Sequence, residues 1–203
     1  MTSRGGGDGA PEAGVVIRAV RVDDAAATAA LHLRSWRWAY RGILPDAFLD
    51  GLSLEEWTAN RRKHLEHPPR PALRWWVAER DGRMEGISLT GLSRDADALE
   101  GESEVYALYL EPDCVGAGTG RALLQRSLDD LAERGVRRVA IWVFEANARA
   151  RRFYEKAGFR LDDSPAGRKM KSFGTPPSVA EAPEVRYRRE IGPPAPARTG
   201  ARP

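Results

Sequence analysis

The chain has 203 residues, with 32 Lys and Arg against 29 Asp and Glu, a formal net charge of +3, and one cysteine, Cys114. This length suffices for one domain of ordinary size with its own core. The balanced charge argues against a nucleic-acid partner, the lone cysteine excludes an intrachain disulfide, and no apolar run approaches the length of a membrane span. We expect a cytoplasmic protein without nucleic-acid or membrane partners, and a homodimer is left open.

The two ends of the chain differ in composition from its middle. Residues 1–14 are glycine-rich and lack the apolar core of a signal peptide, so we expect a disordered leader there. Residues 192–203 are proline-rich, which predicts a disordered tail. The sequence therefore predicts one domain over residues 15–191.

The first half of this domain predicts two helices and a hairpin. The elements are a strand at 15–20, a helix from about 24 to 40, a helix from 53 to about 67, and strands at 74–80 and 84–92. Asp23 or Asp24 can cap the first helix, and Ser53 with Glu56 forms a capping box for the second. Asp81-Gly82 is a tight hairpin signal between the two strands.

The stretch that begins at Glu104 predicts a strand, a glycine loop and a helix. Its first seven residues are mostly aliphatic or aromatic, and Pro112 ends the strand. Three glycines at alternate positions follow: Gly116, Gly118 and Gly120. From Thr119 the leucine spacing is helical. A helix that begins at such a loop presents unpaired N–H groups and its positive end, which form an anion site suited to phosphate.

The remaining elements complete an α/β (α+β) fold. They are a strand at 137–144, a helix at 147–157, a strand beginning at 159–161, a long polar loop at 162–183 with a candidate strand at 168–171, and a last strand at 185–190. The strand–helix–strand unit must give one parallel pair, while the hairpins give antiparallel ones. We therefore expect a mixed, mostly antiparallel sheet of about seven strands, flanked by about four helices.

The glycine spacing does not fit the two common nucleotide loops. A P-loop ends in Gly-Lys-Ser/Thr, whereas Gly120 is followed by Arg121, and G-x-G-x-G is not the dinucleotide fingerprint G-x-G-x-x-G. The stretch resembles the coenzyme A pyrophosphate loop of the GNAT-type N-acetyltransferases, Gln/Arg-x-x-Gly-x-Gly/Ala, with Gly118 and Gly120 at its last two positions. Val115 stands where that family has Gln or Arg. The alternative is a glycine turn without a ligand.

A second motif supports the resemblance. Residues 147–159 resemble the family's Asn-x-x-Ala-x-x-Phe-Tyr-x-x-x-Gly-Phe, at the expected distance after the glycine loop. The order of elements over residues 15–191 is also similar to the GNAT order, which implies a sheet splayed in the middle. Residues 35–45 resemble a bacterial subgroup of the family whose substrates are mostly unassigned.

The resemblance implies acetyl-CoA as cosubstrate. His32, His64 and His67 do not have metal-ligand spacing, so we expect no metal. The pantetheine arm would lie between two diverging strands and pair with exposed backbone. The implied cofactor-binding residues are Leu108, Leu110, Val115, Gly116, Gly118, Thr119, Gly120, Arg121 and Asn147. Arg121 could equally be a solvated helix residue, and Asn147 could be a helix N-cap, a pantetheine ligand or both.

The resemblance also implies an acid and a base. Tyr154 resembles the family's general acid, which protonates the departing thiolate. A lysine-like amine has a pKa of about 10 and must lose a proton before it attacks. Glu104 resembles the carboxylate that removes this proton in several members, and Glu102 and Tyr106 compete with it. Cys114 has no neighbour in the sequence that would make it a nucleophile.

The acceptor pocket is predicted less directly. Trp36, Tyr40 and Tyr106 are its candidate residues, with Trp38 beside them, although helical spacing favours core packing for at least one aromatic residue of that helix. Residues 36–45 and 162–183 are expected to border the pocket, opposite the pyrophosphate. The sequence thus predicts an N-acetyltransferase acting on a small amine, a peptide N-terminus or a lysine. The alternative is a catalytically silent acyl-CoA-binding sensor with the same fold.

Overall fold

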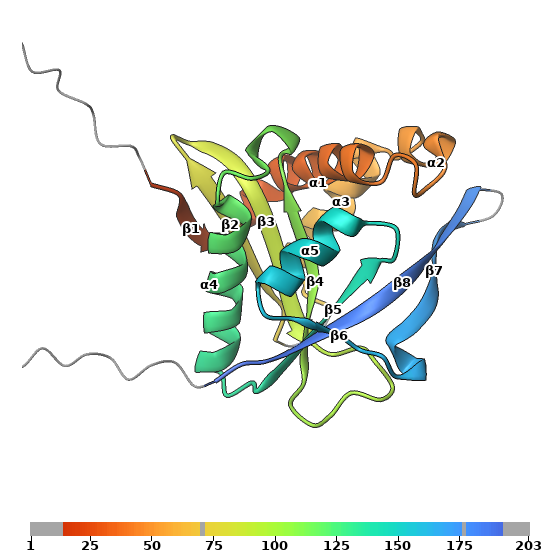
Figure 1. Ribbon diagram of the computed structural model, residues 1–203. Helices are drawn as coiled ribbons and strands as arrows, with labels where there is room; N and C mark the ends of the chain where they lie inside the picture. The colour runs from red at the N-terminus through yellow and green to blue at the C-terminus, as the bar shows by residue number, and fades with distance from the viewer. Residues whose placement is uncertain (1–13, 70–71, 176–177, 193–203) are drawn as a thin grey trace, which may run out of the picture.

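A central sheet organises the chain in the computed structural model, which describes residues 14–69, 72–175 and 178–192 (Figure 1). The predicted leader and tail fall almost wholly outside these residues. The strands are β1 (Val16–Ala19), β2 (Arg74–Arg80), β3 (Arg83–Leu92), β4 (Ser103–Leu110), β5 (Arg138–Phe144), β6 (Arg160–Leu161), β7 (Arg168–Thr175) and β8 (Ser178–Glu190). Their order is β1-β2-β3-β4-β5-β8-β6, with β7 also pairing with β8. Only β4 and β5 pair in parallel, which confirms the predicted mixed, mostly antiparallel sheet.

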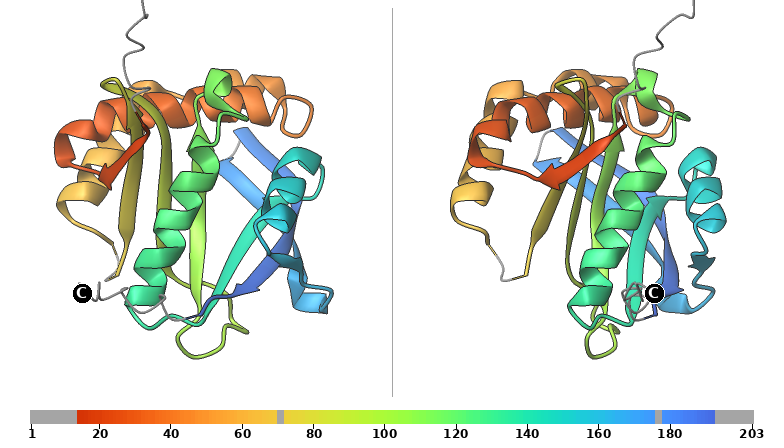
Figure 2. Two further views of the ribbon diagram at one scale, coloured as in Figure 1. Left: turned by 60° about the vertical axis from the view of Figure 1, so that its left-hand side comes forward. Right: turned by 90° about the vertical axis from the view of Figure 1, so that its left-hand side faces the viewer.

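Helices cover both faces of this sheet (Figures 1 and 2). They are α1 (Ala25–Ala39), α2 (Asp46–Asp50), α3 (Leu54–Glu66), α4 (Thr119–Glu133) and α5 (Ala148–Lys156). Ile87 of β3 packs with Leu31 of α1, whereas its neighbour Ser88 shares a 2.7 Å hydrogen bond with Ser127 of α4. Because successive side chains of a strand point to opposite faces, α1 and α4 lie on opposite sides of the sheet.

Local chemistry accounts for several helix ends, but not for the start of α1, where the Asp24 side chain binds Arg18 and does not cap the helix. Ser53 accepts a hydrogen bond from the amide of Glu56 at the start of α3. The chain leaves α4 and α5 through Gly135 and Gly158, whose positive φ angles of 82° and 83° suit glycine best. The described helices exceed the predicted four by α2, a five-residue turn after Pro45.

The predicted long loop at 162–183 is wrong, because most of it is a β-hairpin. β7 and β8 pair antiparallel from Thr175 with Ser178 to Arg168 with Val185. The polar composition of this segment led to the loop interpretation, although Pro183 stands within β8. Pro183 lies just beyond Glu184, which forms the last pair of β8 with β5 opposite Phe144. A strand tolerates the missing N–H of a proline at such a position. β8 is therefore longer than predicted and lies between β5 and β7.

The sheet opens in the middle, between β4 and β5. These strands pair only at Ser103 with Val139, Glu104 with Ala140 and Val105 with Ile141, and then diverge. Among the described residues, the rest of β4 has no strand partner on that side, while β5 continues to pair with β8. The divergence confirms the predicted splay and leaves backbone groups of β4 facing an opening.

Candidate active site

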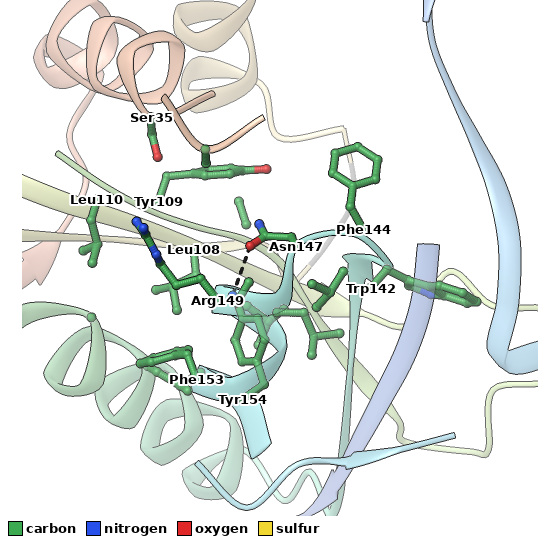
Figure 3. Close-up of a pocket in the computed structure, with 18 of the residues that line it drawn as sticks. Ser35, Leu108, Tyr109, Leu110, Trp142, Phe144, Asn147, Arg149, Phe153 and Tyr154 are labelled. Atoms are coloured by element: carbon green, nitrogen blue, oxygen red, sulfur yellow. Dashed lines mark hydrogen bonds between the residues drawn. The ribbon is translucent and has the colours of Figure 1, made fainter. Parts of the chain in front are cut away.

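One cavity of about 1610 Å³ occupies the opening between β4 and β5. It has two sides, which we name by what the sequence predicted for them. The cofactor side is lined by β4, the glycine loop, α4 and α5, and the acceptor side by the end of α1, the loop after β3, β7 and β8. Figure 3 shows Leu108 and Leu110 of β4 and Phe153 and Tyr154 of α5 around this space, with the Tyr109 hydroxyl directed towards the side of Phe144.

The glycine loop leaves a set of amides without partners. Gly116 and Gly118 have φ angles of 94° and 89°, and Gly118 is the N-cap of α4. Among the described residues, no acceptor binds the N–H groups of Val115, Gly116, Gly118, Thr119, Gly120 and Arg121. These groups and the positive end of a fifteen-residue helix make this corner of the cavity a site for an anion.

The start of α4 is fixed to the sheet by a buried carboxylate. The Thr119 hydroxyl donates to Glu85 of β3 at 2.5 Å, and Arg80 donates to the other oxygen of Glu85 at 2.9 Å. Burial opposes the charge of Glu85, but these two hydrogen bonds hold its pKa below the usual value. Gly120 also has to be small, because a Cβ there would lie 3.0 Å from Leu110. The loop is thus held rigidly without occupying its own amides.

Asn147 and Arg121 have different surroundings. The Asn147 side chain accepts a 3.1 Å hydrogen bond from the amide of Ala150, so it is the N-cap of α5, and it also lines the cavity (Figure 3). Arg121 is exposed at the rim and has no ion pair with any described residue. Both alternatives predicted for Arg121 therefore stay open.

Tyr154 presents a hydroxyl without a partner to the cavity. Its ring packs between Phe153 and Phe159, and only 6% of the residue is exposed. No hydrogen bond to a described residue engages its hydroxyl. Burial, with a smaller contribution from Tyr109, raises the pKa of Tyr154 well above its usual value, so the phenol stays protonated at neutral pH.

Aromatic side chains form the wall nearest to α1. Trp36 contacts both Tyr40 and Trp57 edge-on, at centroid distances of 5.3 and 5.2 Å, and Tyr40 lies 4.8 Å from Phe144. The Tyr40 and Tyr109 hydroxyls are 3.4 Å apart, and burial raises the pKa of both. Trp36 is 7% exposed, so it is both a core residue and part of the lining, as is Tyr40.

Glu104 lines the cavity but is not free. It is 1% exposed, and its carboxylate accepts hydrogen bonds from the Arg94 side chain and from the Arg94 amide at 3.2 Å. The guanidinium carbon of Arg94 also lies over the Tyr106 ring, 4.1 Å from the ring centroid. The competitor Glu102 is also buried and bound, in its case to Arg188 at 2.8 Å.

Several residues lining the acceptor side were not singled out from the sequence. They are Arg94, Asp95, Tyr109, Lys169, Lys171, Phe173 and Glu184. The last four come from the β7–β8 hairpin that was predicted as a loop. The alternation of Lys169, Lys171 and Phe173 was the available signal, because it places all three on one face of a strand. Cys114, by contrast, is buried and donates to Asp113, and burial raises its pKa to about 11, which makes it a poor nucleophile.

Comparison with known proteins decides the family. The sequence profile of the acetyltransferase (GNAT) family matches residues 28–159, which include both the glycine loop and Tyr154. The chain belongs to the GNAT acetyltransferase family. A probable N-acetyltransferase from Mycobacterium tuberculosis is 30% identical over 147 residues, which cover 72% of this chain and 80% of that protein. The resemblance predicted from the two motifs is thereby confirmed.

Two further GNAT relatives extend the comparison. The mycothiol acetyltransferase of Thermobispora bispora is 36% identical over 124 residues, 60% of this chain and 42% of that protein. The chain spans less than half the length of the mycothiol acetyltransferases first compared with it. The PaiA N-acetyltransferase of Thermoplasma acidophilum, solved with coenzyme A, has a TM-score of 0.61 at 19% identity, over 85% of this chain and 99% of that one. This last similarity shows a shared fold.

Two general features of this GNAT chain complete the description. Among the described residues, no group of three or more His, Cys, Asp and Glu side chains lies close enough to hold a metal ion. No helix in the described ranges combines the length and the apolarity needed to cross a bilayer.

Proposed function

We propose that this chain is an acetyl-CoA-dependent N-acetyltransferase that acts on a primary amine. One observation carries the proposal: unpaired amides at the N-terminus of α4, unpaired backbone of β4 and the Tyr154 hydroxyl all face a single cavity. The first two would bind the cosubstrate, and the third would act on its leaving group. The solved relative from Thermoplasma acidophilum, which holds coenzyme A, supports this choice of ligand.

The cofactor side fits the parts of acetyl-CoA in order along the cleft. The free amides from Val115 to Arg121 would bind the pyrophosphate, without the Gln or Arg side chain that the family motif has at the position of Val115. The backbone of β4 near Leu108 and Leu110 would pair with the amides of the pantetheine arm as an added strand does. The thioester would then lie near Tyr154, where β4 and β5 begin to diverge.

The chemistry is a direct transfer. The amine nitrogen forms a bond to the thioester carbon, the carbon–sulfur bond breaks, and the departing sulfur takes the proton of Tyr154. The raised pKa keeps that proton in place until negative charge develops on sulfur. Glu104, predicted to accept the amine's proton, could do so only after Arg94 releases its carboxylate.

Binding and turnover test the proposal separately. Acetyl-CoA at a hundred times its dissociation constant should stabilise the fold by about 2.7 kcal/mol, which raises Tm by about 5–11 °C for a domain of this size. Release of free thiol should then follow with at least one amine from a panel of free amino acids, peptides with a free N-terminus and Nα-acetyl-lysine. No rise in Tm would contradict the cofactor site. A rise without thiol release from any amine would indicate the silent acyl-CoA-binding module instead.

A further inference from the structure

The carboxylates that line the cavity differ in what already binds them. Asp95, Glu104 and Glu184 are the acidic residues of its lining in the described chain. Asp95 accepts from Arg186 at 2.9 Å and from the Trp142 indole at 3.0 Å. Glu104 is held by Arg94 through both of its oxygens. Neither carboxylate is available to a substrate without breaking an ion pair.

Glu184 is the exception. No described residue forms a hydrogen bond or an ion pair with its half-buried carboxylate. It lies on β8, paired with Phe144 of β5 on one side and with Lys169 of β7 on the other. Lys169 is directed elsewhere, since its ammonium lies 3.5 Å from the Trp142 ring centroid and 3.7 Å from Asp95.

The position of Glu184 is close to the predicted reaction centre. Its strand partner Phe144 ends β5 and contacts Tyr40, and α5 with Tyr154 begins four residues later. The charge of Glu184 also helps to raise the pKa of Tyr40 and of Tyr109, which places it within electrostatic reach of both hydroxyls. An amine that approaches the thioester from the acceptor side therefore passes this carboxylate.

The other candidate base in the lining is His32, which is poorly suited to the task. Its Nδ1 lies 3.0 Å from Arg61, its ring stacks on Tyr109 at 4.0 Å, and its Nε2 is buried without a partner. Burial and the Arg61 charge lower its pKa well below the usual value. A proton taken up there would be placed beside an existing buried cation.

We infer that Glu184, rather than Glu104, accepts the proton of the acceptor ammonium before acetyl transfer. The inference rests on the proposed acetyltransferase activity and names its base. The ammonium gives one proton to the Glu184 carboxylate, and the freed electron pair forms the carbon–nitrogen bond. As the carbon–sulfur bond breaks, the sulfur takes the Tyr154 proton, and the second proton of the nitrogen restores the phenol. Glu184 then releases its proton to water.

The surroundings of Glu184 make its carboxylate a stronger proton acceptor than a solvent-exposed one. The charged and titratable groups that face it are Lys169 and Lys171 of β7, Arg94, Glu104, Tyr40 and Tyr109. Burial raises the pKa of Glu184 above the usual value, and the three cations only partly offset this effect. A higher pKa makes the carboxylate a stronger proton acceptor.

The test compares Glu184→Gln, Glu104→Gln and Glu181→Gln with the wild type, using acetyl-CoA and the best amine of the panel above. Glu181 is the matched control, because it lies on the same strand, is exposed and bonds to Ser172. We expect Glu184→Gln to lower the single-turnover rate at pH 7 by about a hundredfold to ten-thousandfold, the usual effect of removing a positioned base. The wild-type rate should decline at low pH as Glu184 protonates. The Glu184→Gln rate should instead follow the fraction of unprotonated amine over the whole range, with no break where Glu184 protonates.

The same variant should recover when the amine loses its proton without help. For Nα-acetyl-lysine, whose amine has a pKa of about 10.4, the deficit should shrink as the pH rises towards that value. Acetyl-CoA affinity and Tm should match or exceed those of the wild type, since a carboxylate with a raised pKa disfavours the folded state at neutral pH. A misfolded variant is thereby recognised.

Other results would overturn the inference. A Glu184→Gln rate within twofold of the wild type, or a large loss in Glu104→Gln alone, would assign the base elsewhere while the acetyltransferase activity stands. A wild-type chain that acetylates no amine of the panel would overturn the proposed function and this inference together.

Discussion

The two sides of the cavity are built in different ways. The cofactor side presents backbone groups of one contiguous stretch, from β4 through the glycine loop to the end of α5. The acceptor side presents side chains from α1, the loop after β3, β7 and β8, which lie far apart in the sequence (Figure 1). A backbone site tolerates most changes of side chain, whereas a side-chain site changes with each substitution. This difference suits a domain that keeps one cosubstrate and varies its acceptor.

The largest expected effect comes from the residue where the two sides meet. Tyr154→Phe keeps the ring between Phe153 and Phe159 and removes only a hydroxyl without a partner, so stability should change little. Single-turnover acetylation should fall about a hundredfold to ten-thousandfold, in kcat more than in KM, because the proton is needed only as the carbon–sulfur bond breaks.

Tyr187→Phe is the matched control for this substitution. The Tyr187 hydroxyl accepts from Arg151 at 3.0 Å and donates to Glu155 at 2.8 Å, outside the cavity lining. This variant should lose stability and keep its single-turnover rate. Wild-type rates in Tyr154→Phe would mean that water or another residue protonates the sulfur.

A second prediction tests whether the backbone amides of the glycine loop bind acetyl-CoA. Gly118→Val should weaken acetyl-CoA binding at least about tenfold, or about 1.4 kcal/mol, because the branched side chain keeps a phosphate away from the amides. Gly135→Val is the control, since this glycine ends the same helix with a similar φ of 82° against 89°. Both variants should lose about 1–2 kcal/mol of stability through backbone strain, and only the first should lose affinity in calorimetry. Equal affinities would remove the loop from the site.

Most residues that the sequence predicted for the cofactor side line the cavity in the structure. The positions of Gly118, Asn147 and Tyr154 follow from motif spacing, because each lies at the start of, or within, a single helix. The acceptor side could not be predicted in this way. That Arg94 binds Glu104, and that Glu184 has no partner, depends on how β7, β8 and the loop after β3 pack together. The polar composition of residues 162–183, which was interpreted as a loop, concealed the hairpin that brings Glu184 to the cavity.

A third prediction concerns acceptor binding. Lys171 is half-buried on β7, with its ammonium 5.5 Å from the Phe173 ring centroid and no ion pair with a described residue. Lys171→Gln should change the KM of amines by less than about tenfold. The change in KM should differ between amines that carry a carboxylate and amines that do not. Acetyl-CoA affinity should stay the same. Ser172→Ala, on the outward face of the strand, serves as the control. A change in acetyl-CoA affinity with equal KM for all amines would place Lys171 on the cofactor side.

The prediction with the smallest expected effect tests whether ion pairs fix the loop after β3, which lines the acceptor side. Arg186 is fully buried and binds Asp95, Asp97 and Asp162, and the two first-named aspartates belong to the loop that carries Arg94. Hydrogen bonding from Arg186 lowers the pKa of Asp97 from 3.8 to about 2. A lowered pKa means that this aspartate stabilises the fold above about pH 3.8 and that the contribution disappears as the pH falls towards 2.

Asp97→Asn should therefore destabilise the fold at pH 7 and approach the wild type near pH 2. The Asp97 side chain is 43% exposed, so solvent screening should keep the difference below about 1 kcal/mol. Urea unfolding from pH 7 to 2 measures it, with Asp163→Asn, an exposed neighbour of Asp162 without an ion pair in the described chain, as the control. A difference that stays constant over this range would show that Asp97 acts through the shape of the loop and not through its charge. Acetyl-CoA affinity should be unchanged in both variants. The start of α4 is fixed by the hydrogen bond from Thr119 to Glu85 and not by the Arg186 ion pairs.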